Sequence, residues 1–332
     1  MSTAAKPSAS FTTKRVNRST FVIYEDDIYA GNDTGCDEPS EKHKHDRYVR
    51  LRQYLEECPV EDNDNKPLNP NCDQYFVILT HCHYDHIGGI GQFLPGGTTE
   101  IIMSSSGRDF VESDLETHGL FKYISKPVPW FKVTHWANSF ERLKWPIWHD
   151  DEEPQPFQTE IGLSIIHTPG HTPDELAWYD HDEMHLSCGD SFYEEGEDGM
   201  PIIFPAEGNL IEWVFSMQKL LVFVRSENAR AAAVAEKATE NGWVQVAKRV
   251  KVSCAHQTTA ADGEEILATL EKFAARVYNG DVPVVKKEVS HEEAYYTWRE
   301  EDNESKMSIK APARLMDDAR RFFNLDVSQA GS

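Results

Sequence analysis

The amino-acid sequence predicts a layered α/β protein, because short apolar runs alternate with stretches of helical spacing along the chain. Residues 75–80 (YFVILT) form one such run, which suits a strand covered on both faces. Similar runs occupy residues 100–103, 163–167, 184–188 and 250–254. The chain has 332 residues, of which 39% are hydrophobic, and this is enough to bury a sizeable core.

The start of the chain has a polar, basic composition without the apolar middle of a secretory signal. Its Ser, Thr and Arg content would also suit a transit peptide, but a disordered tail is the more frequent explanation. We therefore expect a disordered tail over residues 1–20, followed by one domain over residues 21–284. Residues 21–30 are rich in β-branched and aromatic types and predict strands that lead into a tight loop at 31–35.

Helical spacing marks the stretches between and after these strands. Residues 43–58 place apolar side chains on one face, which predicts a surface helix followed by a long polar connection. Residues 209–241 predict two helices, the first strongly apolar and the second rich in Ala. Residues 262–278 predict an amphipathic helix. The composition then turns to Lys and Glu, so we expect residues 285–332 to be a helical C-terminal extension.

Residues 120–150 differ in composition from the rest of the chain. Half of the eight tryptophans lie there, together with three prolines. Pro and bulky aromatics at this density predict an irregular, packed insertion. The insertion could be a lid that forms an apolar wall over the substrate, or it could cover a sheet edge or build a subunit contact.

Charge and cysteine content exclude several classes of function. The formal net charge of -23 opposes binding to a phosphate backbone, so we expect no nucleic-acid partner. The six cysteines form no C-x-x-C pair, which indicates neither a zinc knuckle nor a disulfide framework. No apolar run is long enough for a membrane-spanning helix. We expect a cytoplasmic protein without a membrane partner.

The sequence HCHYDH at residues 81–86 directly follows the apolar run 75–80. Alternate side chains of an extended backbone point the same way, so His81 and His83 can converge on one ion. Asp85 and His86 lie past the bend and can reach toward another. Zinc accepts imidazole and carboxylate ligands, and a catalytic site leaves one position for water or substrate. The segment therefore predicts a metal site.

H-x-H-x-D-H after a strand, TPGHT at 168–172, Gly189-Asp190 after a later strand and a late His256 together resemble the metallo-β-lactamase superfamily. The resemblance implies a four-layer αββα sandwich and two divalent metal ions, with zinc as the first choice and iron or manganese as alternatives. It implies that His81, His83 and His171 bind the first ion, that Asp85, His86 and His256 bind the second, and that Asp190 bridges both.

Two further positions match the family less specifically. Asp33-Thr34-Gly35 matches an early loop that supports the metal site by orienting its ligands. Tyr193 lies three residues after Asp190, an offset similar to that of the superfamily's lactonases, and its phenol would hydrogen-bond the tetrahedral oxyanion. A Tyr in such a turn can equally be a packing residue. With Asp85, Tyr193 completes the candidate catalytic residues.

The pattern is most similar to lactonase- and γ-lactamase-like members, which implies hydrolysis of a cyclic amide or ester. A metal-bound water has its pKa lowered to around 7, so hydroxide is available to attack the carbonyl at neutral pH. A thioesterase or glyoxalase II-like enzyme would use the same ions. An iron-dependent oxidoreductase of the persulfide dioxygenase type would use the same scaffold. We expect a small-molecule substrate, and the sequence does not indicate the oligomeric state.

Overall fold

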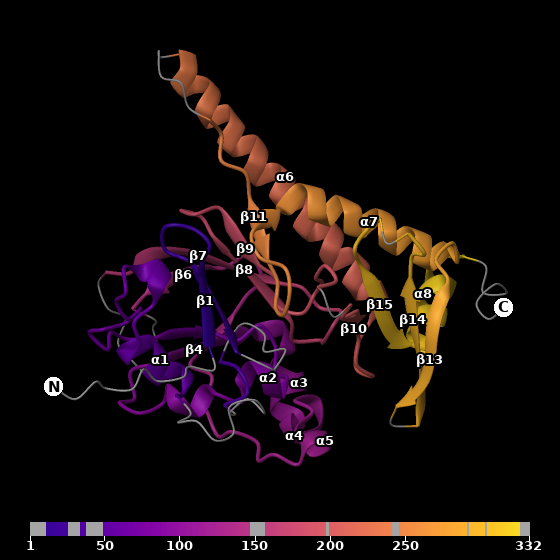
Figure 1. The fold of residues 1–332 in the computed structure, drawn as a ribbon, viewed down its shortest axis with the longest axis horizontal. Coiled ribbons are helices and arrows are strands. Elements are labelled where there is room, and N and C mark those ends of the chain that lie inside the picture. The colour runs from indigo at the N-terminus through magenta and orange to yellow at the C-terminus, as the bar shows by residue number, and fades with distance from the viewer. Residues whose placement is uncertain are drawn as a thin grey trace. The chain divides into compact units, whose positions relative to one another are not determined.

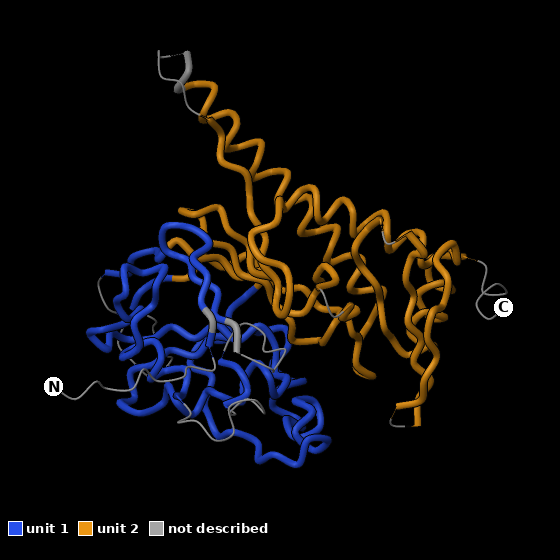
Figure 2. The backbone as a smooth tube through the Cα atoms, viewed as in Figure 1, with its two compact units in different colours: residues 1–138, 144–161 blue, residues 139–143, 162–332 orange. Residues whose placement is uncertain are grey.

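A computed structural model gives the fold of the chain (Figure 1). It describes residues 11–25, 34–37, 49–146, 157–196, 199–240, 246–290, 292–302 and 304–325. The chain forms two compact units (Figure 2): unit 1 is Met1–Asn138 with Lys144–Ile161, and unit 2 is Ser139–Leu143 with Gly162–Ser332. Strands and helices occur in both units, which confirms the predicted mixed α/β architecture.

Unit 1 contains a three-stranded parallel sheet and a separate hairpin. The sheet has the order β3 (Phe76–Ile78), β4 (Glu100–Ser104) and β5 (His135–Ala137). The hairpin pairs β1 (Phe11–Arg15) with β2 (Phe21–Glu25). The helices are α1 (Leu51–Glu57), α2 (Tyr84–Ile87), α3 (Arg108–Ser113), α4 (Leu115–His118) and α5 (Phe121–Ile124), with 3₁₀ turns at Glu61–Asn63, Ile90–Gln92 and Ser105–Gly107.

The core of unit 1 forms around β4, whose five residues are all buried. Such continuous burial is typical of a parallel strand covered on both faces, and it explains the apolar centre of the strand at residues 101–103. Ile101 and Met103 pack in one cluster with Leu79, just after β3, and with Ile87 of α2. The core therefore lies directly behind the segment that carries the HCHYDH motif.

The described residues of unit 2 form two sheets and three helices. One sheet has the order β12-β11-β9-β8-β7-β6 and the other the order β10-β15-β14-β13. The strands of the first are β6 (Arg142–Trp145), β7 (Thr159–His167), β8 (Leu176–Asp180), β9 (His185–Ser187), β11 (Lys251–Ser253) and β12 (Ala261–Asp262). The strands of the second are β10 (Ile202–Ile203), β13 (Val284–Ser290), β14 (Glu293–Arg299) and β15 (Ser308–Pro312). The helices are α6 (Leu210–Glu240), α7 (Gly263–Asn279) and α8 (Ala313–Phe322).

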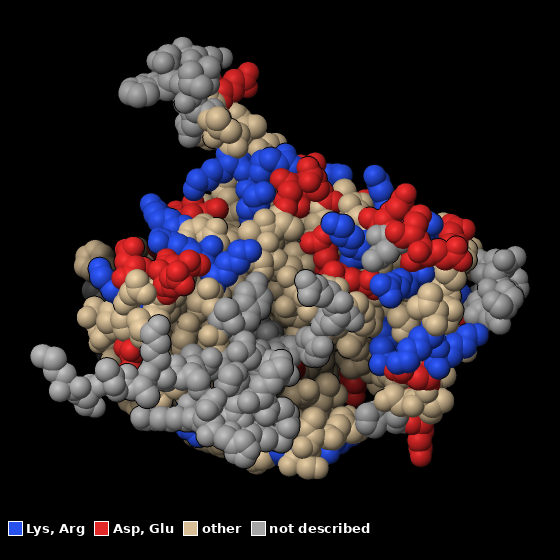
Figure 3. Space-filling model, viewed as in Figure 1, with Lys and Arg blue, Asp and Glu red and all other residues tan. Residues whose placement is uncertain are grey.

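The helices of unit 2 pack against its sheets through one hydrophobic cluster. Trp213 and Leu220 of α6, Leu270 and Phe273 of α7, and Ile309 of β15 belong to it and are at most 1% exposed. Acidic and basic side chains are intermixed over α6 and α7 on the face drawn in Figure 3. Among the described residues, no helix combines the length and apolarity needed to span a bilayer.

The N-terminal tail and the region of 209–241 differ from expectation. Phe11–Arg15 form β1 and pair with β2, so the prediction of disorder over residues 1–20 is wrong for these five; residues 1–10 lie outside the described part.

A single helix, α6, replaces the two helices predicted for 209–241. The sequence from 210 to 240 contains neither Gly nor Pro, so nothing ends the helix at the change from apolar to Ala-rich composition.

The C-terminal extension and the aromatic insertion are more regular than expected. The extension ends in the expected helix, α8, but the residues before it form β13, β14 and β15 in place of the predicted helical structure. Within 120–150, β5 and β6 are regular strands of two sheets. The prediction of an irregular insertion is therefore wrong for these two segments. Residues 147–156 lie outside the described part.

Candidate metal centre

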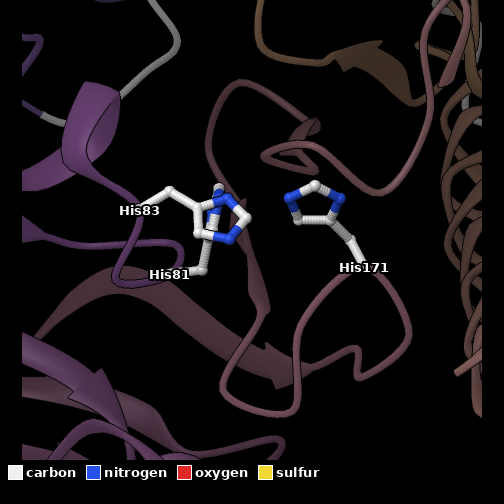
Figure 4. A group of neighbouring side chains, drawn as sticks. All are labelled: His81, His83 and His171. Atoms are coloured by element: carbon white, nitrogen blue, oxygen red, sulfur yellow. The ribbon is translucent and has the colours of Figure 1, made fainter. Parts of the chain in front are cut away.

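Unit 1 carries four of the predicted ligands in the loop after β3 and in α2. His81 and His83 lie in the loop, and Asp85 and His86 lie in α2. The imidazoles of His81 and His83 meet with His81 Nε2 2.9 Å from His83 Nδ1. Figure 4 shows these two rings close together. The extended backbone before the helix thus brings alternate side chains together, as the spacing predicted.

Thr80 orients two of these imidazoles. Its Oγ1 lies 3.2 Å from His81 Nδ1 and 3.4 Å from His86 Nδ1. The two rings pack against each other, with centroids 3.9 Å apart. His86 Nε2 lies 3.7 Å from Asp85 Oδ2. His81 and His86 have no exposed surface, so hydroxyl contact and ring packing restrict both rotamers.

The early loop supports α2 through the backbone. Thr34 donates from both its N–H and its hydroxyl to the carbonyl oxygen of His86, at 2.9 and 2.7 Å. Gly35 accepts from the N–H of Gly89 at 2.8 Å. A Cβ at Gly89 would lie 2.1 Å from the Thr34 carbonyl oxygen, so only glycine permits this approach. Thr34 and Gly35 therefore act on the segment that carries His86, whereas Asp33 lies outside the described residues.

Unit 2 carries the other three ligands in loops at one edge of its six-stranded sheet. His171 follows β7, Asp190 follows β9 and His256 follows β11. β9 and β11 are parallel neighbours, and β7 runs in the same direction because β8 is antiparallel to both β7 and β9. The carboxyl ends of these strands therefore lie at the same edge.

Asp190 lies between the two histidines of unit 2. Its Oδ2 is 3.1 Å from His256 Nε2 and 3.8 Å from His171 Nε2. Side-chain exposure is 8% for Asp190, 5% for His171 and 3% for His256. The carboxylate is therefore largely removed from water and surrounded by imidazole nitrogen.

A backbone carbonyl fixes the tautomer of His171. Its Nδ1 lies 2.7 Å from the carbonyl oxygen of Ile203 in β10, which can only accept a hydrogen bond. Nδ1 therefore carries a proton, so in the neutral imidazole Nε2 holds the lone pair that faces Asp190. His171 lies on a loop (Figure 4), which follows β7 in the chain. Metal-binding histidines are typically oriented by a hydrogen bond of this kind at the second ring nitrogen.

Tyr193 has its phenol engaged inside unit 2. Its hydroxyl donates to the carbonyl oxygen of Pro201 at 2.9 Å, and the side chain is almost fully buried. Its ring lies edge-on to the His256 ring, with centroids 5.5 Å apart. A phenol has one proton to donate, so this geometry favours the packing interpretation over the oxyanion role.

The donor set of both units fits a divalent transition metal. It consists of imidazole nitrogen and carboxylate oxygen without thiolate, which suits zinc as well as iron or manganese. Two ligands of a tetrahedral ion at about 2.0–2.1 Å lie about 3.3 Å apart. The separations of 2.9 Å between His81 and His83 and 3.1 Å between Asp190 and His256 are near that value.

Sequence reasoning did not identify two groups that orient the ligands. Thr80 lies directly before the motif, and its polar side chain at the end of an apolar run was an available signal. The Ile203 carbonyl could not be identified, because every residue type has a backbone carbonyl and the sequence does not show which one contacts His171.

Comparison with known proteins gives a family match over part of the chain. Residues 73–220 match the model of the metallo-beta-lactamase superfamily. That range includes the HCHYDH motif, His171 and Asp190, and ends before His256.

Individual relatives are distant. A putative transcription factor avaE of Aspergillus versicolor is 26% identical, over 94% of this chain and 89% of that protein. A hydroxyacylglutathione hydrolase of Psychromonas ingrahamii is 28% identical, and the match covers 36% of this chain and 34% of that enzyme. A solved metallo-beta-lactamase from Pontibacter korlensis is 15% identical with a TM-score of 0.37, covering 80% of this chain and 93% of that chain.

Proposed function

We propose that this chain is a metal-dependent hydrolase of the metallo-beta-lactamase superfamily, whose family model matches residues 73–220. Candidate metal-holding side chains in each unit support the proposal. Unit 1 supplies His81, His83, Asp85 and His86, and unit 2 supplies His171, Asp190 and His256. The chain thus supplies enough ligands for two divalent ions.

The observation that carries the proposal is the arrangement of His171, Asp190 and His256. One carboxylate oxygen lies 3.1 and 3.8 Å from two imidazole Nε2 atoms, and in the neutral His171 ring the protonated Nδ1 makes Nε2 the nitrogen with the lone pair. Histidines that served only to pack the core would not need to converge on one carboxylate. Deprotonated nitrogen and carboxylate oxygen are the forms that bind divalent metals.

The chain's own residues hold and orient the candidate metal ligands. A bound divalent ion supplies Lewis-acid chemistry, which polarises a carbonyl and lowers the pKa of water to about 7. Thr80 and the Ile203 carbonyl hold the imidazoles in place, so the ligands need little reorganisation. Asp190 would offset part of the positive charge of a bound ion, and it lies close to both histidines of unit 2.

Two substrate classes follow from different observations. A cyclic amide or ester is the class suggested by the offset from Asp190 to Tyr193, but the Tyr193 phenol donates to Pro201. An acyl thioester is favoured by similarity to the hydroxyacylglutathione hydrolase, which spans only part of that enzyme. Both reactions are attack of water on a carbonyl. We propose a carboxylic acid derivative as the substrate, with an acyl thioester and a lactone or lactam as equal candidates.

A panel of lactones, lactams and acyl thioesters tests this function with the purified full chain. We expect turnover of at least one class, its loss after treatment with a chelator and its return when zinc or manganese is added. A chain that binds metal but hydrolyses none of them, and instead consumes oxygen with a persulfide when loaded with iron, would favour the oxidoreductase alternative.

Nucleic-acid binding is the alternative raised by the name of the Aspergillus relative. The net charge of -23 opposes it, because association with a phosphate backbone is driven mainly by Lys and Arg. We propose a small molecule as the partner. Retention of the chain on immobilised duplex DNA at physiological salt would contradict this.

A further inference from the structure

The first turns of α6 contact the loop that carries His171. Asn209 precedes the helix, and its N–H donates to the carbonyl oxygen of Gly170 at 2.7 Å. The Ser216 hydroxyl donates to the carbonyl oxygen of Pro169 at 2.8 Å. Residues 209, 213 and 216 are three to four apart and lie on one face of the helix. This face of α6 therefore lies along the loop 169–171.

Trp213, on the same face, also contacts the loop that carries Asp190. Its indole Nε1–H donates to the carbonyl oxygen of Ser191 at 2.6 Å, and the side chain has no exposed surface. Its backbone lies against Gly170: a Cβ at that glycine would be 2.4 Å from Trp213 Cβ and 2.5 Å from its Cα. Gly170 has φ +151°, which also favours glycine. Trp213 thus touches the residue before His171 and the residue after Asp190.

We propose that Trp213 is a positioning residue for the metal centre, an inference that rests on the proposed metal-dependent function. Its indole fixes the carbonyl next to Asp190, and its backbone limits how close the His171 loop can come. Both contacts together set the separation of 3.8 Å between His171 Nε2 and Asp190 Oδ2. Groups that orient ligands without touching the ion typically change metal affinity by about 10- to 100-fold.

The test compares Trp213→Phe with Trp298→Phe in the full chain. Phe at position 213 keeps an aromatic ring but loses the N–H donated to Ser191. Trp298 is the matched control, because it is 3% exposed and belongs to the same hydrophobic cluster, but lies on β14. The readouts are the Co²⁺ dissociation constant, measured by competition with a chelator, and the visible absorption spectrum of the Co²⁺ protein, which reports ligand geometry.

We expect Trp213→Phe to weaken Co²⁺ binding by about tenfold and to alter the spectrum. Trp298→Phe should lower the thermal midpoint by a similar amount but leave the affinity within about twofold. Equal affinity of Trp213→Phe and wild type, or an equal loss in both variants, would overturn the inference while leaving the proposed function standing. A wild-type chain that binds no Co²⁺ would overturn both.

Ser216→Ala keeps the test decisive if Trp213→Phe does not fold. This variant removes only the hydroxyl that holds Pro169 and retains the helix. We expect a weaker Co²⁺ affinity, by about three- to fivefold, and an altered Co²⁺ spectrum, because one of two anchors of the loop is lost. Unchanged affinity and spectrum would show that α6 does not position the ligand loops.

Discussion

Individual side chains show which parts of the site can be predicted from the sequence. The HCHYDH motif placed His81 and His83 correctly in contact, because their convergence depends only on alternation along extended backbone. His185 matches no position of the metal motif, and the structure shows it to be a core residue: its Nε2 lies 2.9 Å from Ser253 Oγ, and burial lowers its pKa to about 4. Its neutral imidazole belongs to the packing of β9 against β11 and not to the metal site.

The Tyr193 hydroxyl gives a prediction at the residue scale. Tyr193→Phe removes the buried hydrogen bond to Pro201 and leaves its carbonyl without this donor. We expect a loss of about 1 kcal/mol in the free energy of unfolding, measured with urea. Turnover per metal-loaded chain should stay within about twofold of wild type. A tenfold drop in kcat with unchanged stability would instead support the oxyanion role.

At the scale of elements, the sequence predicted best the strands with an apolar centre. The runs at 75–80 and 100–103 correspond to β3 and β4, because the buried Val77 of β3 and the buried Ile101–Met103 of β4 are apolar. β13 was not predicted as a strand, because it lies at an edge of its sheet and most of its side chains are at least partly exposed. Its Lys and Glu content resembled a solvated helix, although its valines favour a strand.

The start of α7 gives a prediction about pH. Asp262 caps the helix through the N–H of Glu265, and both of its oxygens accept hydrogen bonds from Arg249. The Arg249 hydrogen bonds lower the pKa of Asp262 to about 2. A carboxyl whose pKa is lower in the folded state stabilises the fold above about pH 4, and this contribution is lost as the pH falls toward 2.

We therefore expect Asp262→Asn to lower the free energy of unfolding by about 1–2 kcal/mol at pH 7, a value discounted for the exposure of Arg249. The difference from wild type should shrink when urea unfolding is repeated at pH 3. Glu271→Gln, an exposed position on the same helix, is the control and should have little effect at either pH. A difference that does not depend on pH would assign the effect to the cap alone.

At the scale of the whole molecule, the predicted ligands are divided between the two units. Unit 1 contributes His81, His83, Asp85 and His86, and unit 2 contributes the ligands at the ends of β7, β9 and β11. Family resemblance predicted the full set from the sequence, because the motifs are short and lie at strand ends. The division into two units could not be predicted, since it depends on long-range packing and not on a linker of distinct composition.

The metal content of the purified chain tests the central claim most directly. Elemental analysis of protein prepared without added metal and freed from small solutes should give about two divalent transition-metal ions per chain. Asp190→Asn should hold fewer ions while its circular dichroism stays unchanged, and Asp182→Asn, at an exposed turn, should match wild type. A folded wild-type chain that neither contains nor takes up stoichiometric metal would contradict the account.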